Sequence, residues 1–178
     1  SSAMRGLIAP HGGKLVNRLV TGAAADKLRA EAAGLKKVNL SAKQSCDLEM
    51  ITIGAFSPLD GFMGKADFER VCKDMKLASG DIWSIPILLA VKSDGAPKSG
   101  ERVALIAPNG TLQAVMTVKE TFAHDKKLEI PSVFRTEDPA HPGAKQVMDE
   151  GDLCLAGPVE SLVVCPDPKG PEAFLDYR

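Results

Sequence analysis

The segment from Glu101 to Val118, ERVALIAPNGTLQAVMTV, most constrains what this chain can fold into. Two apolar runs of strand length are joined at Asn109-Gly110. This pair is typical of a type I′ turn, whose twist matches that of two paired strands. The segment therefore predicts an antiparallel β-hairpin, and any fold proposed for the chain has to contain one.

Four further strands are predicted by apolar runs of suitable length. One of them contains Pro86, which cannot donate to a ladder and so implies a sheet edge or a bulge. The four segments are Leu15 to Val20, Lys37 to Leu40, residues 82–92 and residues 153–164.

Four helices are predicted from caps and from the 3.6-residue period. The second begins at Ser41-Ala-Lys-Gln44, a capping box in which side chains satisfy two backbone amides reciprocally. Gly34 and Gly151 are placed to end the first and the last helix. The apolar positions are Ala24, Ala25, Leu28 and Ala32 after an N-cap at Thr21; Cys46, Met50 and Ile53; Phe68, Val71, Cys72 and Met75; and Val147 and Met148, facing inward, after Pro142.

Short strands joined by hairpins, with helices between them, predict an α+β domain built on a small curled sheet or β-barrel. A Rossmann fold is disfavoured because it needs regular alternation of strands with long helices and a glycine-rich first turn. The chain has 178 residues, of which 44% are hydrophobic and 25% charged, as expected for one large soluble domain.

The formal net charge is −1 without a long run of one sign, which disfavours nucleic acid and anionic membranes as partners. No apolar run approaches the ~18 residues that a membrane span needs. The four cysteines are scattered, so we expect reduced thiols and a cytosolic chain. Residues 1–3, Ser-Ser-Ala, have the form of a cloning scar, and Met4 is the expected natural start.

Few segments suggest chemistry. Residues 95–100, GAPKSG, resemble half of a phosphate-binding loop but lack the lysine and the following helix, so a turn is favoured. The three histidines are far apart in sequence, no cysteine pair accompanies them, and no nucleophile elbow occurs. His11 in the segment PHGGKLV is either a titratable group beside Gly12-Gly13 or part of a tight turn, and the turn is favoured.

Residues 54–64, GAFSPLDGFMG, combine turn chemistry with large apolar side chains. Pro58 presets φ, Asp60 is able to bond its own backbone, and Gly61 tolerates positive φ. Phe56, Leu59, Phe62 and Met63 are expected to pack inward or against a neighbouring domain. We interpret the segment as architecture and not as a catalytic loop.

Three segments together resemble the amino-terminal part of ATP sulfurylase (sulfate adenylyltransferase). They are APHGGKLVNRLV, ITIGAFSPLDGFMGKADFERVCKDMKL and WSIPILLAVK, and the hairpin and the closing PEAFLDYR fall where that family has comparable features. The resemblance extends over nearly the whole chain. It implies one PUA-like domain over residues 4–178: a small β-barrel or curled mixed sheet with flanking helices.

The family transfers the adenylyl group of ATP to sulfate, giving adenosine 5′-phosphosulfate and pyrophosphate, and it serves sulfate assimilation and sulfur metabolism. The resemblance implies ATP with Mg²⁺ in a longer parent enzyme, whose catalytic domain carries Q-x-R-N and H-x-x-H motifs that this sequence lacks. We therefore assign no catalytic, cofactor-binding or metal-binding residue to this chain. Its expected role is structural, as a cytoplasmic module that contacts the catalytic domain and other subunits of a homo-oligomer.

Two other functions stay open. PUA-type folds often bind RNA, but the lysines here are dispersed and balanced by acids, which makes RNA binding the weaker alternative. The third is a stand-alone interaction protein.

Overall fold

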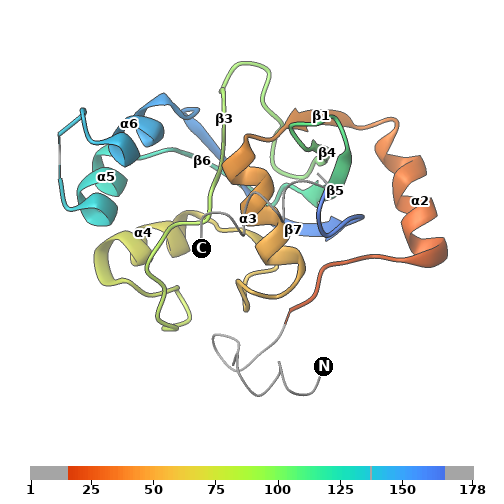
Figure 1. Cartoon of the computed structure of the whole chain (residues 1–178), viewed down its shortest axis with the longest axis horizontal. Helices are drawn as coiled ribbons and strands as arrows, with labels where there is room; N and C mark the ends of the chain where they lie inside the picture. The colour runs from red at the N-terminus through yellow and green to blue at the C-terminus, as the bar shows by residue number, and fades with distance from the viewer. Residues whose placement is uncertain (1–15, 137, 167–178) are drawn as a thin grey trace. The chain divides into compact units, whose positions relative to one another are not determined.

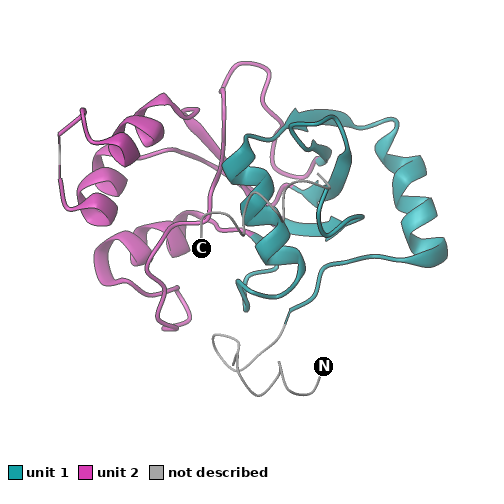
Figure 2. Ribbon diagram, in the orientation of Figure 1, with its two compact units in different colours: residues 1–61, 102–117, 158–178 teal, residues 62–101, 118–157 magenta. Residues whose placement is uncertain are grey.

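The computed structural model describes residues 16–136 and 138–166. Within it the chain divides into two compact units, each assembled from segments distant in sequence (Figure 2). Unit 1 comprises residues 1–61, 102–117 and 158–178, and unit 2 comprises residues 62–101 and 118–157. The expected scar, His11 with its glycines, and the closing PEAFLDYR lie outside the described residues.

Unit 1 is built on a mixed sheet in the order β1-β4-β5-β7. β1 pairs in parallel with β4, whereas β4–β5 and β5–β7 are antiparallel. The strands are β1 (Lys36–Asn39), β4 (Arg102–Ile106), β5 (Leu112–Thr117) and β7 (Leu153–Ser161), of which residues 158–161 belong to this unit.

Two helices, α2 (Gly22–Ala32) and α3 (Ala42–Thr52), flank β4 and β5 in unit 1 (Figure 1). Because both faces of these strands are covered, consecutive residues along each strand are buried. The side chains between α2 and the sheet form one apolar cluster: Ala25, Leu28, Ala32, Ala104, Val115 and Leu162.

Unit 2 pairs two short strands with residues 153–156 of β7. β3 (Leu89–Val91) and β6 (Glu120–Ala123) both run antiparallel to it. The helices of this unit are α4 (Lys65–Asp74), α5 (Lys126–Phe134) and α6 (Pro142–Asp149), and a two-residue strand β2 (Gly61–Phe62) falls at the division between the units. The α+β class and the curled mixed sheet are thus confirmed.

The predicted hairpin is confirmed as β4 and β5, but the predicted turn type is wrong. Only Gly110 has positive φ (89°), whereas a type I′ turn needs it at both central residues. The amide of Gly110 donates to the carbonyl of Ala107 at 2.9 Å, and that of Ala107 donates to Thr111 at 2.9 Å. Pro108 has the fixed φ that suits position i+1 of a type I turn, so the loop is a three-residue one with left-handed glycine last.

The capping box at the start of α3 is confirmed in both directions. The Ser41 hydroxyl accepts from the Gln44 amide at 3.1 Å, and Oε1 of Gln44 accepts from the Ser41 amide at 2.9 Å. Thr21 occupies the N-cap of α2, but its side chain makes no capping hydrogen bond. Ala24, predicted on the inner face of that helix, is exposed.

Two predicted strands are largely absent. In residues 16–20 only Leu19 forms a single bridge, to Ser161. Within 82–92 only Leu89–Val91 is a strand. Pro86 cannot donate to a ladder, and Nε1 of Trp83 donates to the Ile85 carbonyl at 2.8 Å, so the chain before β3 follows an irregular path.

Two further residues predicted to face the core point to solvent. Met148 is 51% exposed, because α6 buries Ala144 and Val147 and Met148 lies a further 100° around the helix. Met75 is 50% exposed because it is the left-handed C-cap of α4, where the chain turns away from the helix axis. Gly151 follows α6 as predicted, and a Cβ there would collide with the backbone of Val91.

Candidate functional site

The segment of residues 54–64 is the sequence motif with the most unusual composition. It begins where α3 ends, at Gly54 with φ 84°, and ends at Gly64, the N-cap of α4. The predicted inward packing is confirmed for Leu59, Phe62 and Met63, which are 2–7% exposed. Gly61 does not have the positive φ predicted for it; it belongs to β2 instead.

Ser57 is fully buried, and both hydrogen-bonding functions of its hydroxyl are used by backbone groups. The hydroxyl donates to the Gly54 carbonyl at 2.6 Å and accepts from the Val16 amide at 2.8 Å. A hydroxyl engaged in this way is not available as a nucleophile. The side chain of Asp60 is exposed, and its backbone carbonyl accepts from the Val159 amide at 2.9 Å. This geometry supports the architectural interpretation of the segment.

The glycines of residues 95–100 serve turns in the connection between β3 and β4. Gly95 and Gly100 have φ of 70° and 97°, and the Gly100 amide donates to the Val118 carbonyl at 2.7 Å. No helix follows this loop, so it offers no helix N-terminus to a phosphate.

Three of the thiols are held in the unreactive, protonated form. Burial raises the pKa of Cys46 to about 11, and burial raises the pKa values of Cys72 and Cys154 to about 12, in each case with a contribution from neighbouring carboxylates. Nucleophilic cysteines need the opposite shift. In the described part of the chain no three His, Cys, Asp or Glu side chains are grouped as a metal site.

The two described histidines have different roles. His141 is the exposed N-cap of α6, and its Nδ1 accepts from the amide of Gly143 at 3.1 Å. His124 is buried: its Nε2 lies 2.6 Å from Oε1 of Glu129, and its Nδ1 lies 3.1 Å from the Gly151 carbonyl. Sequence reasoning missed this pair. The N-cap Asp125 that begins α5 directly after His124 could have suggested that Glu129, one turn into the helix, faces back toward it.

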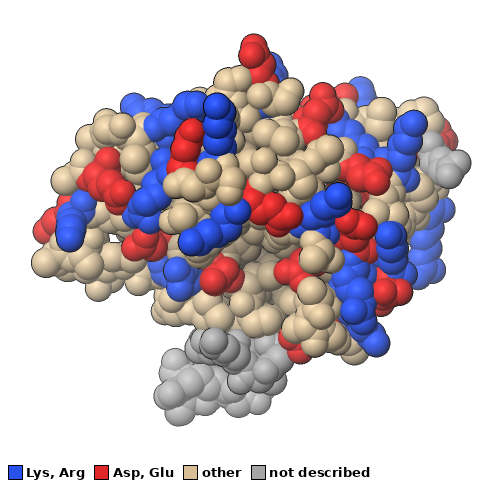
Figure 3. Space-filling view, turned by 180° about the vertical axis from the view of Figure 1, so that it is seen from behind, with Lys and Arg blue, Asp and Glu red and all other residues tan. Residues whose placement is uncertain are grey.

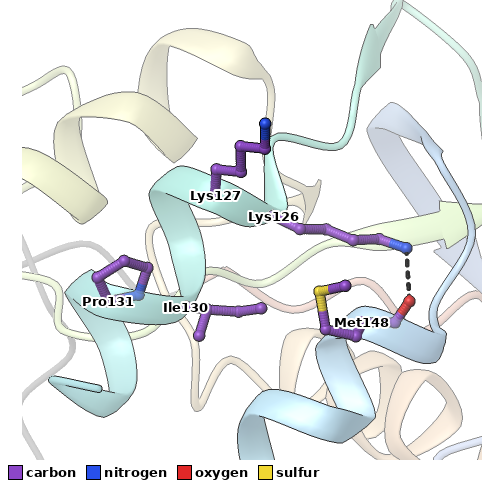
Figure 4. Close-up of a pocket in the computed structure, with 5 residues that line it drawn as sticks. All are labelled: Lys126, Lys127, Ile130, Pro131 and Met148. Carbon is purple, nitrogen blue, oxygen red and sulfur yellow. Dashed lines mark hydrogen bonds between the residues drawn. The ribbon is translucent and has the colours of Figure 1, made fainter. Parts of the chain in front are cut away.

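A pocket of about 340 Å³ lies in unit 2 between α5 and α6 (Figure 4). Lys126 and Ile130 extend from α5 toward Met148 of α6, whereas Lys127 points away from it. The ammonium group of Lys126 donates to the carbonyls of Met148 and Glu150 and lies 3.3 Å from Asp152. Lys126 therefore neutralises the carboxyl end of α6.

The surface charges are mixed. On the face that Figure 3 shows, Lys and Arg side chains are interspersed with Asp and Glu, with no continuous stripe of one sign. In unit 1, Arg102 binds both carboxylate oxygens of Glu31 at 2.7 Å and one of Glu160 at 3.1 Å. The Arg102 guanidinium lowers the pKa of Glu31. These ion pairs connect α2 to the sheet. An RNA-binding surface needs cationic side chains that are free to contact phosphates, and Arg102 is already paired with carboxylates.

Residues 8–163 match the family described as PUA-like domain. The chain belongs to the PUA-like domain family. This PUA-like domain is 44% identical to the sulfate adenylyltransferase of Symbiobacterium thermophilum over 96% of the chain and 43% of the relative. It is 42% identical to the sulfate adenylyltransferase of a Synechococcus species, over 95% of the chain and 44% of the relative.

A solved structure is also similar to this PUA-like domain. The hexameric APS kinase from Thiobacillus denitrificans superposes with a TM-score of 0.68 at 29% identity, over 96% of this chain and 29% of that one. The chain thus spans less than half the length of each of these relatives. The resemblance inferred from the quoted motifs is confirmed. Separately, no described helix has the length and apolarity that crossing a membrane requires.

Proposed function

We propose that this chain is the amino-terminal domain of a sulfate adenylyltransferase, which forms adenosine 5′-phosphosulfate and pyrophosphate from ATP and sulfate. The observation that carries the proposal is the 44% identity to a sulfate adenylyltransferase over 96% of the chain. Its role is structural: it contacts the catalytic domain and other subunits of a cytoplasmic homo-oligomer, and it has no catalytic activity by itself.

The chemistry of the described residues supports a role without catalysis. Adenylyl transfer needs cationic and polar groups placed around the phosphates, usually with Mg²⁺ on the nucleotide. The groups described above do not fit that need. The thiols of Cys46, Cys72 and Cys154 are protonated, Ser57 is hydrogen-bonded to backbone groups, and Lys126 and Arg102 are paired with carboxylates. ATP with Mg²⁺ therefore belongs to the rest of the longer enzyme in this proposal.

Sulfate-dependent ATP–pyrophosphate exchange tests the proposal in two arms. In the first, the 178-residue chain alone should show no exchange, with or without sulfate. In the second, this chain replaces the matching segment of the Symbiobacterium thermophilum enzyme, and the chimera should retain exchange and its oligomeric state. The same enzyme with that segment deleted is the control, and it should lose assembly.

Three results would contradict the proposal. Sulfate-dependent exchange by the chain alone would place catalytic groups within it. A chimera that folds and assembles but is inactive would mean that this domain has a role in turnover beyond its structural one. Sub-micromolar RNA affinity at physiological salt would favour the RNA-binding alternative instead.

A further inference from the structure

The environment of His124 in unit 2 requires more protons than a neutral imidazole and a carboxylate can supply. Both ring nitrogens face oxygen acceptors: the carboxylate of Glu129 at 2.6 Å and the Gly151 carbonyl at 3.1 Å. A neutral imidazole carries one N–H, so one of these two contacts would bring lone pairs together. Either His124 is the imidazolium, or Glu129 carries the proton and donates it.

Both forms contain the same number of protons, and the loss of that proton leaves a net negative charge in a buried site. The side chain of His124 is 0% exposed and that of Glu129 is 9% exposed. Phe68 packs edge-on against the imidazole, with ring centroids 6.4 Å apart. An unpaired carboxylate in such surroundings is costly, so the proton is held more tightly here than in the unfolded chain.

The other titratable groups around the pair do not replace this proton. Burial by itself lowers the pKa of His124, but Glu129, the Gly151 carbonyl and Glu150 outweigh it and raise the pKa above its ordinary value. Asp125, the N-cap of α5, adds negative charge beside Cys72 of α4. Cys72 and Cys154 of β7 are neutral thiols, and Lys126 is paired with Asp152.

We propose that His124 and Glu129 form a proton lock in unit 2: the pair holds one proton through neutral pH and fastens α5 to the segment between α6 and β7. Glu129 projects from α5, His124 directly follows β6, and Gly151 lies between α6 and β7. When the proton is lost, one of the two contacts becomes repulsive and α5 loosens. The same helix carries Lys126 and Ile130, so the pocket in Figure 4 responds to the state of the lock.

The sign of the pH dependence follows from the raised pKa. The stabilisation is fully present below the ordinary histidine value of about 6.5 and is lost as pH rises through the pKa of the folded pair. One linked proton changes the unfolding equilibrium constant by at most about tenfold per pH unit in that window.

The test uses the whole 178-residue chain. NMR titration of the imidazole carbon-bound protons, assigned with His124→Gln, should show a midpoint at His124 above the ordinary histidine value of about 6.5, because the pair loses its shared proton late whichever partner carries it. Urea unfolding is then measured from pH 6 to 9 for the wild type, Glu129→Gln and His141→Gln. In Glu129→Gln, the amide donates to a neutral imidazole whose other N–H donates to Gly151, so both contacts survive without the proton.

We expect the unfolding constant of the wild type to rise relative to that of Glu129→Gln, by up to about tenfold per pH unit above pH 6.5. His141→Gln removes an exposed histidine of the same unit and should follow the wild-type profile. Parallel profiles for the wild type and Glu129→Gln would overturn the proposal. If Glu129→Gln does not fold, the titration of the wild type decides: a His124 midpoint at or below about 6.5 overturns it.

Discussion

In unit 1 the buried polar residues of the described chain are neutral hydroxyls and amides, whereas unit 2 buries an imidazole and a carboxylate. The neutral set is Gln44, Ser45, Thr52, Ser57, Gln113 and Ser161, and the titratable set is His124 and Glu129. Hydroxyls and amides satisfy one another without net charge, as where Ser45 donates to Gln113 at 2.7 Å. The difference teaches that one half of a chain can bury polar groups that do not respond to pH while the other half buries a pair that does.

The largest expected effect comes from removing a buried apolar side chain of unit 2, a change that involves no titratable group. Phe62 is 3% exposed, so Phe62→Ala should lower the free energy of unfolding by about 3–5 kcal/mol through lost burial and a cavity. The loss should be the same at pH 6 and pH 9, which separates packing from the proton lock. Urea unfolding of the variant at both values checks it.

Asp60→Asn is the matched control, because the Asp60 side chain is exposed in the same segment. It should leave the unfolding free energy within about 0.5 kcal/mol of the wild type. In the chimeric enzyme the same variant should retain exchange. Loss of turnover with intact folding and assembly would show that the segment is catalytic and that its architectural interpretation is wrong.

A smaller effect is expected from the neutral network of unit 1. Ser45→Ala leaves the buried Oε1 of Gln113 without its donor, which should cost about 1–3 kcal/mol. The cost should not change between pH 6 and pH 9, since neither group titrates there. A pH-dependent cost, measured in the same unfolding series, would contradict the contrast between the two units.

Helix caps provide a comparison in which the units should behave alike. Ser41 caps α3 in unit 1 by accepting from Gln44 at 3.1 Å, and Asp125 caps α5 in unit 2 by accepting from Leu128 at 3.0 Å. Ser41→Ala and Asp125→Ala should each cost about 1 kcal/mol. Thermal unfolding of both variants measures the two costs. If Asp125→Ala costs several times more than Ser41→Ala, the two caps are not equivalent and Asp125 stabilises unit 2 by more than its capping hydrogen bond.

Among the changes expected to destabilise the chain, the smallest effect is at Arg102, whose partners are more than a third exposed. Arg102→Met should cost about 1 kcal/mol or less and should be weakened by salt. Hydrogen bonding to Arg102 lowers the pKa of Glu31 in the folded chain. The stabilisation by this ion pair is therefore present at pH values above the ordinary pKa of a glutamate, and it is lost as pH falls through the pKa that Glu31 has in the folded chain. Unfolding measured at pH 3–5, with and without 1 M salt, should show this loss of stability. The loss occurs as pH falls, whereas the stabilisation by the proton lock is lost as pH rises.

The sequence by itself determined the local elements whose signals involve neighbours in the chain. The capping box at Ser41, the hairpin of β4 and β5 and the helix α4 are short-range patterns, and each is present. The long motif GAFSPLDGFMG and its companions also sufficed to indicate the family, because a string of that length carries more information than any propensity.

Only the tertiary structure decided which residues meet across long separations. Burial was wrongly predicted for Met75 and Met148, because the sequence shows that a residue is apolar but not the direction in which the backbone turns its side chain. The contact of His124 with Glu129 and Gly151 depends on how α5 and α6 return to β7, and the Arg102 cluster joins α2 to strands more than 70 residues away. Such contacts are fixed by the packing of distant segments, which no local pattern encodes.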